Sequence, residues 1–132
     1  MLTEIDFTIL LLLTAVLVAD VGQEGVSPKK KRVMNMHLRQ LFPDTGLAQR
    51  WAFVGQALTD LPEIRDGIAF LKLIEEKSTH LSAMLDEDMR KEVMLTLLDV
   101  AVGDGKVPEP VERVLRTVAR PFGFASTLQM PD

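Results

Sequence analysis

The stretch LLTAVLVADVGQEGVSPKKKRVMNMHLRQLF, residues 12–42, decides the predicted fold, because residues 94–124, MLTLLDVAVGDGKVPEPVERVLRTVARPFGF, repeat its pattern. Each stretch begins as an apolar run and passes through a short loop that contains glycine and acidic residues. A valine followed by serine or proline then opens a run with apolar residues at helical spacing. Two related helical pairs at the two ends of the chain predict a duplicated, pseudo-symmetric helical bundle.

The rest of the chain also has helical periodicity, and strand signals are almost absent. The sequence contains no tyrosine and shows no sustained alternation of polar and apolar residues. We therefore expect an all-α fold, a compact bundle of six or seven helices. Thr3, Ser27 and Asp60 are the expected N-caps, and Glu63 would complete a capping box with Asp60. The expected helices cover 3–20, 28–42, 45–58, a helix that starts at 60–63, 79–85, 86–102 and 108–122.

The apolar run FTILLLLTAVLVA, residues 7–19, is shorter than the roughly 20 apolar residues of a membrane-spanning helix. An acidic start without a clear cleavage site also fits a signal peptide poorly. We expect a buried core helix instead, and a cytoplasmic protein with no transmembrane segment. This helix and the one at 86–102 should be the most buried. We expect residues 1–124 to form a single domain and residues 125–132 to form a loose tail.

Charge is unevenly distributed along the 132 residues. The net charge is −4, yet residues 27–43 carry five lysines and arginines and no acid. A protein that binds duplex nucleic acid is usually basic across a whole face, so this single basic spot predicts no nucleic-acid partner. The high apolar content, 47% of the residues, indicates that some apolar surface is left for a protein partner or for a second copy in a homodimer.

The basic run opens the helix predicted at 28–42. Positive charges in a first turn lie at the positive end of the helix dipole, which is locally unfavourable, so the arrangement needs an explanation. One reason is solvation, or pairing with nearby acids. A second is an anion or partner contact at the free N–H groups of the helix start. The third, a nuclear-import or DNA-binding signal, fits poorly because the four charges fall inside a predicted helix without interleaved aromatic residues. The residues of the anion or partner contact site would be Ser27, Lys29, Lys30, Lys31 and Arg32.

The loop of the second repeat carries oxygen ligands suited to Ca²⁺ or Mg²⁺. The candidate ligands are Asp99, Asp104, Glu109 and Glu112, with Asp20 and Glu24 as the weaker counterpart in the first repeat. The spacing is not that of an EF-hand loop. The other interpretation is structural: Asp104 and Gly105 end a helix, and the two glutamates stabilise the start of the next one.

The histidines, the tryptophan and the methionines are expected to have structural rather than catalytic roles. We expect His37 to be buried and hydrogen-bonded, and His80 to be exposed in a connector, so zinc is not expected. We expect Trp51 and the methionines to lie in the core or to form an adaptable contact surface. The chain has no cysteine, no Gly-x-Ser-x-Gly, no phosphate loop and no dinucleotide fingerprint. No catalytic residues are assigned, and no enzyme activity or resident cofactor is expected beyond weak binding of Ca²⁺ or Mg²⁺.

Taken together, the two repeats resemble the tellurite-resistance TerB family over residues 7–124. Its pattern is an apolar helix that ends in Ala-x-x-Asp-Gly, a Val-Ser-Pro-like turn and an acidic helix start. The second repeat matches at Ala101, Asp104, Gly105, Val107, Pro108, Glu109 and Glu112, and the first at Ala19, Asp20, Gly25, Val26, Ser27 and Pro28. The first repeat departs from the pattern, because Lys29 to Arg32 stand where the family has glutamates.

The resemblance implies an all-α domain of about seven helices in a bacterial response to tellurite or other chemical stress. It also implies a non-enzymatic module, with divalent metal at the acidic loops. The expected function is therefore a cytoplasmic helical module that acts through protein contacts. A domain that binds divalent cations or anions with its inter-helix loops is the alternative, and a small helical enzyme is a third.

Overall fold

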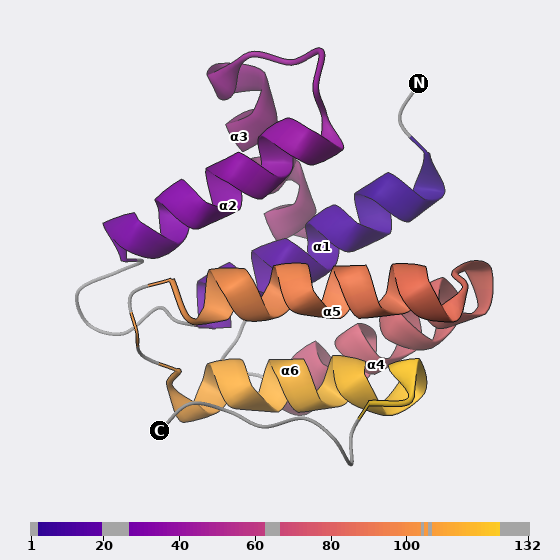
Figure 1. Cartoon of the computed structure of the whole chain (residues 1–132). Coiled ribbons are helices and arrows are strands. Elements are labelled where there is room, and N and C mark those ends of the chain that lie inside the picture. The colour runs from indigo at the N-terminus through magenta and orange to yellow at the C-terminus, as the bar shows by residue number, and fades with distance from the viewer. Residues whose placement is uncertain (1–2, 20–26, 63–66, 104, 106, 125–132) are drawn as a thin grey trace.

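The computed structural model describes residues 3–19, 27–62, 67–103, 105 and 107–124, which form six helices and no strand (Figure 1). Within these residues the predicted all-α bundle of six or seven helices is confirmed. The helices are α1 (Glu4–Ala19), α2 (Pro28–Leu41), α3 (Leu47–Asp60), α4 (Gly67–Met84), α5 (Glu87–Ala101) and α6 (Glu109–Phe122).

Helix α1 is the centre of the bundle and packs against each of the other five. Thr3 caps it, as predicted, because the Asp6 N–H donates to Thr3 Oγ1 at 3.1 Å; the Thr3 N–H also donates to Asp6 Oδ2 at 3.2 Å, which makes the cap reciprocal. Every side chain in 10–17 is buried. The apolar run is therefore the interior of the bundle. No helix in the described part of the chain combines the length and hydropathy of a membrane span.

Helices α2 and α5 pack side by side and run in opposite directions (Figure 1). Ser27 and Pro28 open α2 at the predicted positions. The first turn of α2 lies so close to the end of α5 that a Cβ atom on Gly103 would be 3.2 Å from the Cα of Lys30. Further along the pair, His37 of α2 is hydrogen-bonded to Asp99 of α5. These contacts fix the register between the two helices.

Glycines in left-handed conformation follow the last two helices. After α5 ends at Ala101, Gly105 has φ +80° and its N–H donates to the Val102 carbonyl at 2.8 Å, so a turn follows the helix, while the predicted stop residue Asp104 lies outside the described residues. After α6, Gly123 has φ +86°, and the Phe124 N–H donates to the Ala119 carbonyl at 2.9 Å. This second arrangement is a Schellman motif, for which glycine is favoured because it has no Cβ.

The first and last helical pairs contact each other crosswise, since α1 packs on α6 and α2 packs on α5. The end of α1, the start of α2, the end of α5 and the start of α6 all lie at one end of the bundle (Figure 1). Reciprocal contacts of this kind are those that two related hairpins would make. The pseudo-symmetry of the two repeats remains a prediction.

Two predicted features around α4 are wrong. Asp60 is the last residue of α3 and does not cap the following helix, which begins at Gly67. Its expected capping partner, Glu63, lies outside the described residues. The predicted helix at 79–85 is not separate, because α4 continues unbroken to Met84. The physical reason is its buried stripe, which keeps helical spacing throughout: Phe70, Ile74, Ser78 and Leu81.

The expected ranking of buried helices is half right. Ten of the sixteen residues of α1 are buried, which confirms it as the core helix. The prediction that α5 is among the two most buried helices is wrong. Helix α5 buries five of its fifteen residues, whereas α6 buries six of fourteen. Apolar residues occur on both sides of α5, so its outer side exposes Met89 and Leu95 to solvent. High apolar content alone does not say which side of a helix is covered.

Candidate functional site

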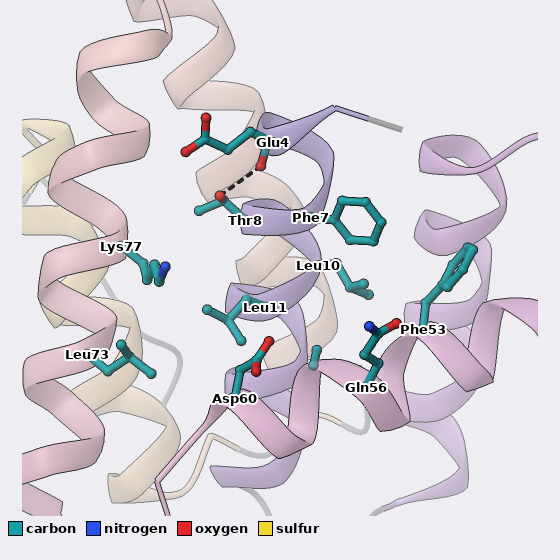
Figure 2. Close-up of a pocket in the computed structure, with 11 residues that line it drawn as sticks. Glu4, Phe7, Thr8, Leu10, Leu11, Phe53, Gln56, Asp60, Leu73 and Lys77 are labelled. Carbon is teal, nitrogen blue, oxygen red and sulfur yellow. Dashed lines mark hydrogen bonds between the residues drawn. The ribbon is translucent and has the colours of Figure 1, made fainter. Parts of the chain in front are cut away.

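A pocket lies over the first half of α1, between α3 and α4 (Figure 2). Its volume is about 610 Å³, within the range of roughly 300–1,000 Å³ that is usual for ligand pockets. Leu10 and Leu11 of α1 line its base, Phe53 of α3 lines one wall and Leu73 of α4 lines the other. We call it the α1–α3–α4 pocket. Most of its lining is apolar, so it suits an apolar group.

Two phenylalanines, Phe7 and Phe53, line this pocket, and both pack against the ring of Phe42. Phe42 is 1% exposed, and its ring centroid lies 5.2 Å from that of Phe53 and 6.3 Å from that of Phe7. Phe7 meets Phe53 edge to face, with centroids 6.1 Å apart. Offset and edge-to-face contacts of this kind stabilise aromatic clusters. The buried ring of Phe42 thus holds two pocket rings in place, and Phe7 remains 42% exposed.

Charged and polar groups stand at the rim. Glu4 lies at one end of the pocket and Asp60 at the other, while Lys77 projects from α4 (Figure 2). Glu4 Oε1 is 2.7 Å from His80 Nε2, so its orientation is fixed by α4. Asp60 is the last residue of α3, where the negative end of the helix dipole adds to its charge. The rim therefore carries two carboxylates and one amine, with the Glu4 carboxylate bonded to His80.

The one hydroxyl in the described lining is already engaged. Thr8 Oγ1 donates to the Glu4 carbonyl at 2.8 Å within α1, as Figure 2 shows. The Thr8 hydroxyl therefore donates to a backbone carbonyl and not to a side-chain base that would activate it as a nucleophile. The chemistry that the pocket offers is apolar contact, one amide at Gln56 and three rim charges.

The predicted basic site is divided by the fold. Ser27 precedes α2 and its side chain makes no capping hydrogen bond. Lys29, Lys31 and Arg32 are exposed, but Lys30 is fully buried. The reason is the helical register, which turns Lys30 toward the end of α5 at Gly103. Lys30 is therefore not available for an anion or a partner at the surface, whereas its neighbours are.

The predicted acidic ligands do not converge in the described part of the chain. Asp99 bonds His37, Glu109 is paired with Arg113, and Glu112 Oε1 is 2.7 Å from the Arg116 guanidinium. Asp20, Glu24 and Asp104 lie outside the described residues. Among those described, no three His, Asp or Glu side chains are grouped so that they could hold a metal ion. Binding of Ca²⁺ or Mg²⁺ stays a prediction.

The histidines partly match expectation. His37 is hydrogen-bonded, as predicted, but it is 19% exposed and not fully buried. His80 is exposed, as predicted, but it belongs to α4 and not to a connector. Trp51 is half-buried. The methionines divide between two roles: Met34 and Met94 are core, Met84 is half-buried, and Met36 and Met89 are exposed.

Sequence reasoning missed the α1–α3–α4 pocket. From the sequence, we expected Phe7 only to belong to the apolar run and Asp60 to cap a helix. One signal was present in the first helix, because Glu4, Thr8 and Leu11 recur at helical spacing and put polar groups on one side of an otherwise apolar segment. Nothing in the sequence placed α3 and α4 on either side of it. Comparison with protein-family models, curated proteins and solved structures found no match to this chain.

Proposed function

We propose that the protein is a non-enzymatic interaction module that holds an apolar side chain of a protein partner in the α1–α3–α4 pocket. The observation that carries the proposal is the combination of an apolar interior with an exposed aromatic edge. Phe7 offers 42% of its surface at the mouth while Leu10 and Leu11 lie beneath it. Large apolar side chains that fill such recesses supply most of the energy at protein interfaces.

The rim charges define the partner further. Two carboxylates, Glu4 and Asp60, face the mouth together with one amine, Lys77. A partner segment with lysine or arginine next to its apolar anchor would meet complementary charge, which favours correct encounter and orientation. The ligand class is therefore an aromatic or long aliphatic side chain flanked by basic residues.

Two further features support a binding role over catalysis. The described lining residues include no cysteine or histidine, and the single hydroxyl is engaged within α1. The resemblance to the TerB family supports a setting in the bacterial cytoplasm, in a response to tellurite or related chemical stress. In that setting the module would act by bringing its partner to other components.

Selection from a random peptide library displayed on phage tests this function. The wild-type protein should enrich peptides with an aromatic or aliphatic residue beside lysine or arginine. Counter-selection against the variants Phe7→Ala and Asp60→Lys should remove them, because these variants lose the aromatic edge and reverse a rim charge. The matched controls Leu47→Ala and Asp44→Lys, at exposed positions outside the pocket, should retain them.

Two outcomes would refute the proposal. One is the absence of any enriched sequence class. The other is enrichment of peptides that bind the pocket variants and the wild-type protein equally well. Circular dichroism spectra of all four variants should match that of the wild-type protein, since each substitution is at a partly or fully exposed position.

A further inference from the structure

The outer side of the α2–α5 pair exposes large apolar side chains. Met36 of α2 is 61% exposed, and on α5 Leu95 is 58% and Met89 44% exposed. Beside them a groove of about 230 Å³ runs between the two helices, with Ile9 and Leu13 of α1 at its base. Exposed apolar side chains next to an apolar recess are typical of a surface that another protein covers.

Charged residues continue this surface in both directions. On α2, Lys29, Arg32 and Met36 follow one another at spacings of three and four residues, which places them on one side of the helix. On α5, Asp88, Glu92 and Leu95 do the same. All four charged residues are exposed, and so are Lys91, which lies between Asp88 and Glu92 and leaves two acids against one base there, and Arg39, three residues after Met36. We give the name α2–α5 face to Lys29, Arg32, Met36, Asp88, Glu92 and Leu95.

The His37–Asp99 hydrogen bond sets the positions of these charges. At a rise of 1.5 Å per residue, Arg32 and Lys29 lie about 7.5 and 12 Å along α2 from His37. Glu92 and Asp88 lie about 10 and 16 Å along α5 from Asp99. Because the helices are antiparallel, the two pairs lie in opposite directions. The α2–α5 face thus has a basic end, an apolar centre and an acidic end.

We propose that the occupant of the α2–α5 face is a second copy of this chain, bound in a two-fold symmetric dimer. A rotation of 180° about an axis through the centre of the face reverses its direction. The basic end of each copy then lies over the acidic end of the other, and the apolar centres meet. A two-fold interface of this kind uses the same patch on both chains, so the patch must complement itself. The charge order of the α2–α5 face satisfies that condition.

The same rotation also brings the exposed apolar side chains against apolar surface of the other copy. Met36 and Leu95 of one copy reach the groove of the other, whose walls include Leu41, Met89 and Val93. Methionine adapts its shape to an irregular recess, which suits Met36 and Met89 to this contact. The face is on the side of α1 opposite the α1–α3–α4 pocket, because Ile9 and Leu13 point away from Phe7 and Leu11. Dimer formation and the proposed pocket function can therefore be tested independently.

Light scattering on a size-exclusion column, from micromolar to millimolar protein, measures the mass directly. The wild-type protein should approach twice its chain mass of 14.7 kDa as the concentration rises. The variant Lys29→Glu/Arg32→Glu has two acidic ends, and Asp88→Lys/Glu92→Lys has two basic ends. Each should elute with the mass of one chain. An equimolar mixture of the two should recover the double mass, because their ends are complementary again.

A second pair of variants tests the apolar centre. Leu95→Asp should give a monomer. Ile68→Asp should leave the dimer intact, although Ile68 is 86% exposed and so is the more accessible of the two, because it lies on α4 outside the α2–α5 face. The proposal is overturned by a wild-type monomer over the whole concentration range. It is equally overturned by a dimer that Ile68→Asp breaks and Leu95→Asp does not, or by failure of the mixed variants to associate.

Discussion

Asp99 Oδ2 accepts a hydrogen bond from His37 Nε2 at 2.7 Å, although the two residues are 62 positions apart in the sequence. The contact joins the second helix of the first predicted repeat to the first helix of the second repeat. Asp99 was a predicted cation ligand, and the structure gives it a partner on α2 instead. The pair therefore connects the two repeats.

A double-mutant cycle on this pair measures the connection. His37→Gln and Asp99→Asn should each lower the free energy of unfolding by about 0.2–1 kcal/mol, because the Asp99 carboxylate is largely exposed and solvent weakens the interaction. The double variant should lose less than the sum of the single losses. Urea denaturation monitored by circular dichroism gives the three values. Strict additivity would show that the contact does not contribute to stability.

Gly103 and Gly55 should respond in opposite ways to a change to alanine. A Cβ atom on Gly103 would lie 3.2 Å from Lys30 Cα and 3.3 Å from the Val100 carbonyl oxygen, so the backbone of α2 or α5 would have to shift by a few tenths of an ångström. Gly103→Ala should therefore cost about 1–3 kcal/mol of unfolding free energy. Gly55, inside α3, has nothing within 4 Å of its Cβ position, so Gly55→Ala should stabilise by about 0.5–1 kcal/mol. Thermal unfolding of both variants checks the two signs, and a stable Gly103→Ala would disprove the close approach of α2 to α5.

The central position of α1 predicts a large loss at Leu12, which is completely buried. Leu12→Ala should lower the free energy of unfolding by about 2–5 kcal/mol, from lost apolar burial and the cavity left behind. The control Leu47→Ala, at a position 56% exposed on α3, should lower it by less than about 0.5 kcal/mol. Similar losses at both positions in chemical denaturation would contradict the placement of α1 at the core.

Divalent cations should leave the melting temperature unchanged. Glu109 and Glu112 are paired with arginines, and Asp99 with His37, so these three predicted ligands are engaged by partners on the protein. Differential scanning fluorimetry with millimolar CaCl₂ or MgCl₂ measures the shift. A rise in melting temperature that Asp104→Ala abolishes would instead establish the cation site that the sequence predicts at the second repeat.

Helix content and most helix boundaries could be predicted because their signals are local. Thr3, Ser27 and Pro28 mark helix starts whatever the rest of the chain does, and each was placed correctly. The boundary at Asp60 failed because an aspartate two residues before a proline suits a helix start as well as the end of a helix. Only the packing of α3 against α1 shows which of the two applies.

The functional surfaces could not be predicted because they depend on tertiary contacts. Phe7, Phe42 and Phe53 come from three separate segments, and nothing in their spacing indicates one cluster. The charge of the basic run could be predicted from the sequence, but not which of its residues would face the neighbouring helices. The burial of Lys30 among exposed neighbours follows from where α5 lies. The face of α5 that stays exposed was likewise hidden, since apolar residues occur on both of its sides.

Isothermal titration of a peptide enriched by the display selection tests the role of the α1–α3–α4 pocket most directly. The dissociation constant should rise at least tenfold for Phe7→Ala and for Asp60→Lys, a loss of about 1.4 kcal/mol in binding free energy. It should stay within a factor of two for Leu47→Ala and Asp44→Lys. Equal affinity of the peptide for all five proteins would contradict the account, because binding would then occur away from the pocket.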